Sequence, residues 1–126
     1  MSMDLSFWAW MARDHAQLYR GETKVGVAIQ AQVYGEVYSG CNIEMPFNHG
    51  MHAEVNAIGS MIRINPLARV KRILIAADRP LFTPCGACMD WLMHFGDDDT
   101  IVIHEREPGV KTFEAIAGEL MPHYPR

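Results

Sequence analysis

Two short segments hold the residues best suited to chemistry, Met51-His52-Ala53-Glu54-Val55 and Pro84-Cys85-Gly86-Ala87-Cys88. Between them, His52, Cys85 and Cys88 offer one imidazole nitrogen and two thiolates, a set that zinc accepts in tetrahedral geometry. Three protein ligands leave a fourth position open for water, whereas a structural zinc site normally has a fourth Cys or His at short spacing. The spacing therefore predicts a catalytic site that holds one Zn²⁺ per chain.

Glu54 follows His52 by two residues and is the predicted general acid/base. A carboxylate beside a zinc-activated water can accept a proton and later give one to a departing group. Both ligand segments are expected at helix N-termini, where exposed N–H groups favour the thiolate forms of Cys85 and Cys88. Such a site suits attack on an electron-poor ring carbon that bears an amino group. It could equally hydrolyse an amide, so the surrounding sequence must decide between the two.

Length and composition favour one domain over residues 1–126, with 49% hydrophobic and 21% charged residues. The net charge is −4 and the Lys and Arg residues are scattered, without the basic stripe of a nucleic-acid binder. This favours a small diffusible substrate. The apolar run 73–77 is far shorter than the roughly 18 residues of a membrane span, so we expect no membrane contact and a cytoplasmic location. Three cysteines, two of them in a C-x-x-C, favour reduced thiols.

The hydrophobic pattern predicts alternating helices and strands. Helices are expected over residues 4–18, 52–64, 85–95 and 111–120, and strands over 24–33, 36–43, 70–77 and 100–104. Gly21 would end the first helix, and Gly26 inside a strand indicates that another segment packs close to its backbone. The predicted fold class is a three-layer α/β/α domain, with a mixed sheet of about five strands and helices on both faces.

The chain resembles the cytidine deaminase family, and the resemblance follows the family's order over nearly the whole chain. The segments that carry it are Gly40-Cys41-Asn42-Ile43-Glu44, Met51 to Glu54, Thr83 to Cys88, and Glu119 to Pro122. An H-x-E followed by P-C-x-x-C is the known signature of zinc-dependent nucleobase deaminases. The resemblance implies hydrolysis of a free cytidine-like nucleoside to the uridine-type product and ammonia, as in pyrimidine salvage.

The same resemblance implies roles for further residues. Asn42 and Glu44 would hold the ribose hydroxyls, and Ala53 would contact the substrate. The backbone around Thr83 and Pro84 would accept a hydrogen bond from the leaving amino group. Short members of the family are homotetramers whose sites are completed by neighbouring subunits, so a homo-oligomer, and specifically a homotetramer, is expected.

The sequence departs from the family pattern in ways that bear on the substrate. The family's C-A-E-R segment is H-A-E-V in this chain. The change of Cys to His and the change of Arg to Val belong together, because an imidazole in place of a thiolate makes the zinc site less negative and removes the need for an adjacent Arg. The family's F-P-V-G-A appears as 23–27, Thr-Lys-Val-Gly-Val, which lacks the ring that flanks the base. Phe47 or His49 are candidates to replace that ring. The expected substrates are therefore cytidine, deoxycytidine, or a modified or N4-substituted cytidine.

Three alternatives to this activity remain open. H-A-E-V-N-A-I resembles the metal helix of deoxycytidylate deaminases, whose 5′-phosphate site would here need Arg63, Lys71 or Arg79; a blasticidin-S-like aminonucleoside is a further enzymatic alternative. An alternative of another class is a non-catalytic zinc-binding module that keeps the site for stability.

Overall fold

The computed structural model describes residues 4–47 and 49–125, in which four helices and five strands follow one another along the chain. Their bounds are α1 Leu5–Arg13, β1 Val25–Ala31, β2 Val37–Cys41, α2 Ala53–Ile64, β3 Val70–Ala77, α3 Gly86–Phe95, β4 Ile101–Glu107, β5 Val110–Ile116 and α4 Ala117–Leu120. None of the helices in this part of the chain is long and apolar enough to cross a membrane.

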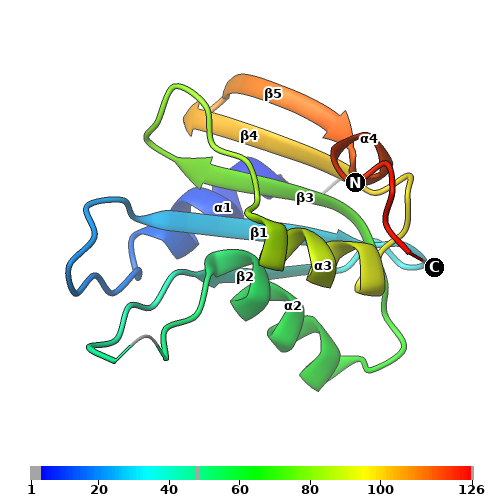
Figure 1. Ribbon diagram of the computed structural model, residues 1–126, viewed down its shortest axis with the longest axis horizontal. Coiled ribbons are helices and arrows are strands. Elements are labelled where there is room, and N and C mark those ends of the chain that lie inside the picture. The colour runs from blue at the N-terminus through cyan, green and yellow to red at the C-terminus, as the bar shows by residue number, and fades with distance from the viewer. Residues whose placement is uncertain (1–3, 48, 126) are drawn as a thin grey trace.

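The strands form one mixed sheet in the order β2-β1-β3-β4-β5. β3 and β4 are parallel, and α3 makes the crossover between them, while the other neighbouring pairs are antiparallel. Helix α1 packs against one face of the sheet, and α2 and α3 lie side by side on the other (Figure 1). The predicted α/β fold, with a mixed five-stranded sheet and helices on both faces, is confirmed.

The centre of the sheet is apolar on both faces, as its position between two helical layers requires. From Ile73 to Ala77, β3 is buried at every residue, because its side chains pack with those of α1 on one side and those of α2 and α3 on the other. Gly26 of β1 shows how close the α1 layer is, since a Cβ there would lie 2.0 Å from the carbonyl oxygen of Ala9. The close packing expected at Gly26 is therefore confirmed.

Two predicted elements differ from the structure. The helix expected over 111–120 is wrong, because β5 pairs antiparallel with β4 and only Ala117–Leu120 is helical. Gly109, with φ of +80°, allows the tight reversal between these strands, and β5 takes up backbone groups that β4 would otherwise expose at an edge. The first helix ends at Arg13, so Gly21 does not terminate it.

Candidate metal centre and adjoining pocket

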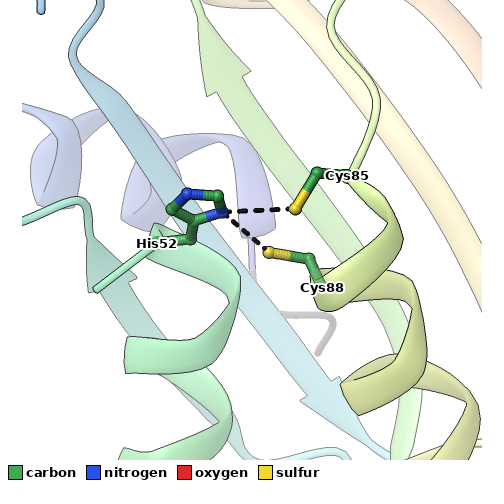
Figure 2. Close-up of side chains that lie close together, drawn as sticks. All are labelled: His52, Cys85 and Cys88. Atoms are coloured by element: carbon green, nitrogen blue, oxygen red, sulfur yellow. Dashed lines mark hydrogen bonds between the residues drawn. The ribbon is translucent and has the colours of Figure 1, made fainter. Parts of the chain in front are cut away.

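The three predicted metal ligands meet where α2 and α3 begin. His52 is the N-cap residue of α2, Cys85 is the N-cap residue of α3, and Cys88 lies in the first turn of α3. Nδ1 of His52 is 3.2 Å from Sγ of Cys88 and 3.4 Å from Sγ of Cys85 (Figure 2). The ligand atoms of all three residues lie within 4.8 Å of one another.

This geometry fits a zinc ion. Zn–S bonds of about 2.3 Å and Zn–N bonds of about 2.0 Å at tetrahedral angles place nitrogen and sulfur about 3.5 Å apart, close to the observed separations. Burial raises the pKa of the Cys88 thiol, and the nearby Glu54 carboxylate raises it further. A thiol in these surroundings becomes a thiolate ligand only when a cation offsets the charge, which a dication does.

The position of α2 depends on close contact with β2. A Cβ at Gly40 would lie 2.5 Å from the backbone nitrogen of Ala57, so only glycine allows the helix to lie this near the strand. The side chain of Asn56 accepts a hydrogen bond of 3.0 Å from the backbone N–H of Cys41, joining the helix to the strand end. These contacts fix where the helix presents His52 to the two cysteines.

Glu54 occupies the first turn of α2 and faces the same site. The residue is only 3% exposed, and it lines the cavity that His52 and Cys85 also line. Burial raises the pKa of its carboxyl group, whereas its own backbone N–H, His52 and the Cys88 thiol act in the opposite direction. A carboxyl group with a raised pKa beside an open metal position is suited to exchanging protons near neutral pH.

A cavity of about 670 Å³ opens over this centre, within the range of small-molecule sites. Its walls come from the segment before β1, the end of β2 with the loop that follows, the start of α2, and the β3–α3 loop. The lining residues that the sequence already suggested are Asn42, Glu44, His52, Ala53, Glu54, Thr83 and Cys85.

Two suggested substrate contacts, Phe47 and Pro84, are not among the described lining residues of the cavity. The side chain of Phe47 is 83% exposed, and Phe47 is not among the lining residues that the structure describes. Pro84 is buried and is also not among the described lining residues, although its neighbours Thr83 and Cys85 are. The loop that carries Phe47 still reaches the cavity, through Met45, Pro46 and Gly50.

Asn42 and Glu44 are already bound to the chain segment that precedes β1. Oδ1 of Asn42 accepts a hydrogen bond from the N–H of Val25, and its Nδ2 donates to the carbonyl of Thr23, both at 2.9 Å. Oε1 of Glu44 accepts from consecutive backbone N–H groups of residues 19–21, at 2.8 to 3.1 Å. These bonds lower the pKa of the Glu44 carboxyl, and they leave Oε2 and one Nδ2 proton for a ligand.

The structure adds residues that sequence reasoning missed. Phe82, Tyr19 and Arg20 line the cavity, and the guanidinium of Arg20 lies 5.1 Å from the ring centroid of Tyr19. Position in the sequence could have suggested Phe82, since it lies two residues before the P-C-x-x-C motif. No comparable pattern marks residues 19 and 20, because Glu44 brings them to the site from more than twenty residues away.

The candidate phosphate ligands are dispersed. Arg63 and Lys71 are absent from the described lining of the cavity. Arg79 is absent from it as well, although its Nη2 donates a hydrogen bond to the hydroxyl of Thr23, which lines the cavity.

The family model described as the cytidine and deoxycytidylate deaminase zinc-binding region matches residues 4–104. No curated protein sequence matches the chain. Among solved structures, the chain is similar to the cytidine deaminase from Burkholderia pseudomallei, with a TM-score of 0.83 and 26% identity over 96% of both chains. It is also similar to the cytidine deaminase from Mycobacterium tuberculosis, with a TM-score of 0.80 and 21% identity over 94% of this chain and 92% of that one.

The cytidine deaminase from Mycobacterium leprae has a TM-score of 0.79 and 21% identity over 94% of this chain and 95% of that one. The matched region contains the His52, Cys85 and Cys88 cluster and the buried Glu54. The chain therefore belongs to the cytidine and deoxycytidylate deaminase family of zinc-dependent aminohydrolases.

Proposed function

We propose that this protein hydrolytically deaminates a free cytidine-like nucleoside to the corresponding uridine-type nucleoside and ammonia. The observation that supports this most directly is the buried carboxyl of Glu54, which shares one cavity with the metal ligands and with Asn42 and Glu44. The same cavity thus has both the groups for the reaction and polar groups for a sugar.

The proposed metal is one zinc ion per chain, held by His52, Cys85 and Cys88. When bound there, zinc supplies a Lewis acid that activates water near neutral pH. Glu54 accepts a proton from the attacking water and delivers a proton to the ring nitrogen next to the reacting carbon. Glu54 next takes the remaining proton from the hydroxyl added to the ring carbon and gives it to the departing amino group. The C–N bond then breaks, so that water and substrate become the carbonyl product and ammonia.

Binding groups on both sides of Glu54 orient the substrate in this proposal. Oε2 of Glu44 and the remaining Nδ2 proton of Asn42 bind the ribose hydroxyls, while the side-chain bonds described above hold both residues still. Ala53 lies at the cavity wall, and the backbone around Thr83 and Pro84 accepts a hydrogen bond from the amino group. This arrangement directs the carbon that bears the amino group toward Glu54.

The volume of the cavity and the change at Thr23 favour a range that includes N4-substituted cytidines as well as cytidine and deoxycytidine. Thr23 lines the cavity where the family has a ring, which leaves room beside the base. Arg20 at the wall is a cation that could meet a 5′-phosphate, and this favours testing deoxycytidylate as a second candidate substrate.

An ammonia-release screen of the zinc-loaded protein tests this proposal. The substrates are cytidine, deoxycytidine, CMP, dCMP, N4-substituted cytidines, isocytidine, blasticidin S and free cytosine. We expect release from cytidine-type nucleosides and little from free cytosine, which lacks the sugar. A protein that holds about one zinc per chain, yet releases no ammonia from any of these compounds, would contradict the proposal.

We further propose a cytoplasmic homotetramer that acts in pyrimidine salvage. α1 supports self-association because it presents the exposed side chains of Phe7, Trp8 and Met11. Analytical ultracentrifugation tests the assembly, and a monomer at micromolar concentration would argue against it.

A further inference from the structure

The chain lacks the base-flanking ring at Thr23, but a second loop reaches the same part of the cavity. β1 and β3 are antiparallel with Val25 opposite Ala77, so the segment before β1 lies beside the loop after β3. A hydrogen bond from Arg79 to the hydroxyl of Thr23 joins the two segments. Phe82 belongs to that second loop and lines the cavity together with Thr23.

Of Tyr19 and Phe82, which both line the cavity, Phe82 is the nearer in sequence to a metal ligand. It precedes Thr83, which also lines the cavity, and the metal ligand Cys85. The backbone of Tyr19 is held beside Glu44, the residue assigned to the sugar, because its N–H donates to that carboxylate at 2.8 Å. Phe47 is 83% exposed and outside the described lining. Of these three residues, only Phe82 both lines the cavity and lies in the loop that leads to a metal ligand, Cys85.

A buried histidine holds the loop that carries Phe82. His104 of β4 is fully buried, and its Nε2 lies 2.9 Å from the carbonyl oxygen of Ala77. A carbonyl can only accept, so Nε2 carries the proton and Nδ1 is the acceptor. Nδ1 accepts from the backbone N–H of Phe82 at 3.3 Å and from the hydroxyl of Thr112.

The imidazole therefore binds both ends of the segment from Ala77 to Phe82. The residues between these ends, 78–81, are exposed, and the side chain of Leu81 is 60% exposed, so packing holds them weakly. The ring of Phe82 also lies against the imidazole, with centroids 6.2 Å apart. These contacts fix the direction from which Phe82 enters the cavity.

We propose that Phe82 is the aromatic residue that flanks the base of the substrate, in place of the ring missing at Thr23, and that His104 is its positioning residue. This inference rests on the proposed nucleoside deaminase activity and assigns the specificity of that same site. Because the ring comes from the β3–α3 loop rather than from the segment before β1, the space beside Thr23 stays open to a substituent on the base.

Steady-state kinetics of Phe82 variants test the first part of this proposal, that Phe82 flanks the base. Stacking of a base on an aromatic ring is lost in Phe82→Leu, so we expect KM for cytidine-type substrates to rise about tenfold or more with kcat little changed. Phe82→Tyr keeps the ring and should stay near the wild-type KM. Leu81→Ala, in the same loop but exposed, is the matched control and should leave both constants unchanged.

The outcomes separate this inference from the activity on which it rests. A wild-type protein that releases no ammonia overturns the proposed function. An active wild-type protein whose KM is unaffected by Phe82→Leu overturns the assignment of Phe82 alone. A rise in KM for Phe47→Leu instead would assign the flanking ring to Phe47. Calorimetric titration of cytidine into the Glu54→Gln protein gives the same comparison as binding constants, independently of turnover.

Paired substitutions test His104. His104→Asn places an amide oxygen near the position of Nδ1 and keeps the acceptor for the N–H of Phe82, whereas His104→Leu removes it. We expect KM to rise about tenfold in His104→Leu and much less in His104→Asn, with equal zinc content. In the Phe82→Leu background, His104→Leu should raise KM no further.

A general structural role for His104 would give different results. Equal KM values for the Asn and Leu variants, or an additive effect in the Phe82→Leu background, would overturn the positioning role. If His104→Leu does not fold, His104→Gln takes its place, because its amide lies near Nε2 and leaves Nδ1 unreplaced. The Asn variant should then remain closer to the wild-type KM than the Gln variant.

Discussion

Gly40 offers a sensitive test of how closely α2 must approach the sheet. A Cβ at this position would lie 2.5 Å from the backbone nitrogen of Ala57 and 2.9 Å from the carbonyl oxygen of Ala53. Both atoms belong to the backbone of α2, so no side-chain rotation relieves the overlap. In Gly40→Ala, the helix itself has to move.

The required movement is large for a catalytic site. Ordinary contacts of a Cβ begin near 3.4 Å, so α2 must retreat by about 0.9 Å at Ala57. His52 and Glu54 at the start of the helix move with it, whereas Cys85 and Cys88 on α3 stay in place. A misplacement of about 1 Å can cost roughly a hundredfold in rate, and overpacking costs about 1–3 kcal/mol in stability.

Ammonia-release kinetics and urea unfolding of Gly40→Ala measure the two effects. We expect kcat/KM to fall about a hundredfold and the free energy of unfolding to fall as well. Gly59→Ala is the matched control on the same helix, because a Cβ there meets nothing within 4 Å. It should keep full activity and gain about 0.5–1 kcal/mol in stability. Full activity in Gly40→Ala would refute the argument that this contact sets the geometry of the site.

Three further substitutions test other parts of the structure. Glu105→Ala removes the carboxylate that accepts hydrogen bonds from a hydroxyl and an indole N–H of α1. The free energy of unfolding, measured in urea, should therefore fall by about 1–3 kcal/mol, and an unchanged midpoint of urea unfolding would contradict this. The pKa of the Glu44 carboxyl group is lowered in the folded state. The ionised carboxylate therefore stabilises the fold at pH values above the unfolded-state pKa of about 4.3, and this stabilisation is lost as the pH falls through the lower folded-state pKa. The stability difference between wild type and Glu44→Gln should therefore shrink as the pH falls from about 5 to about 3, and a constant difference would argue against the backbone contacts. Cys85→Ser should lower the zinc content measured by mass spectrometry while Cys41→Ser leaves it unchanged, and equal contents would remove Cys85 from the ligand set.

The sequence predicted best where the local pattern matched the final environment. Residues 70–77 form a nearly continuous apolar run, and the structure places β3 over the same bounds because helices cover both of its faces. The starts of α2 and α3 were also predicted to within one residue. Their motifs fix both the ligand spacing and the helix N-termini, so the cluster of His52, Cys85 and Cys88 followed directly.

Hydrophobic periodicity predicted the wrong secondary structure where pairing with a neighbouring strand determines the conformation. Phe113, Ile116, Ala117 and Leu120 have helical spacing, yet β5 forms because β4 offers an edge with which it can pair. The reversal at Pro108 and Gly109 was the signal that this prediction overlooked.

The contacts that form the walls of the cavity could likewise not be predicted from the local sequence. The bonds that Glu44 accepts from residues 19–21, and the hold of His104 on Phe82, join segments more than twenty residues apart. The family resemblance suggested that Glu44 lies near the substrate, but not that its carboxylate also binds the backbone of the segment before β1.

In the proposed mechanism, Glu54 transfers protons beside a zinc ion that it does not itself coordinate. The direct test is ammonia release by the zinc-loaded Glu54→Gln protein, together with its zinc content and its circular dichroism spectrum. We expect the zinc content and the fold to be retained, and the turnover of the best substrate to fall by about 10²–10⁴-fold. Turnover close to that of the wild type would contradict the catalytic role of Glu54 and favour a site that serves stability alone.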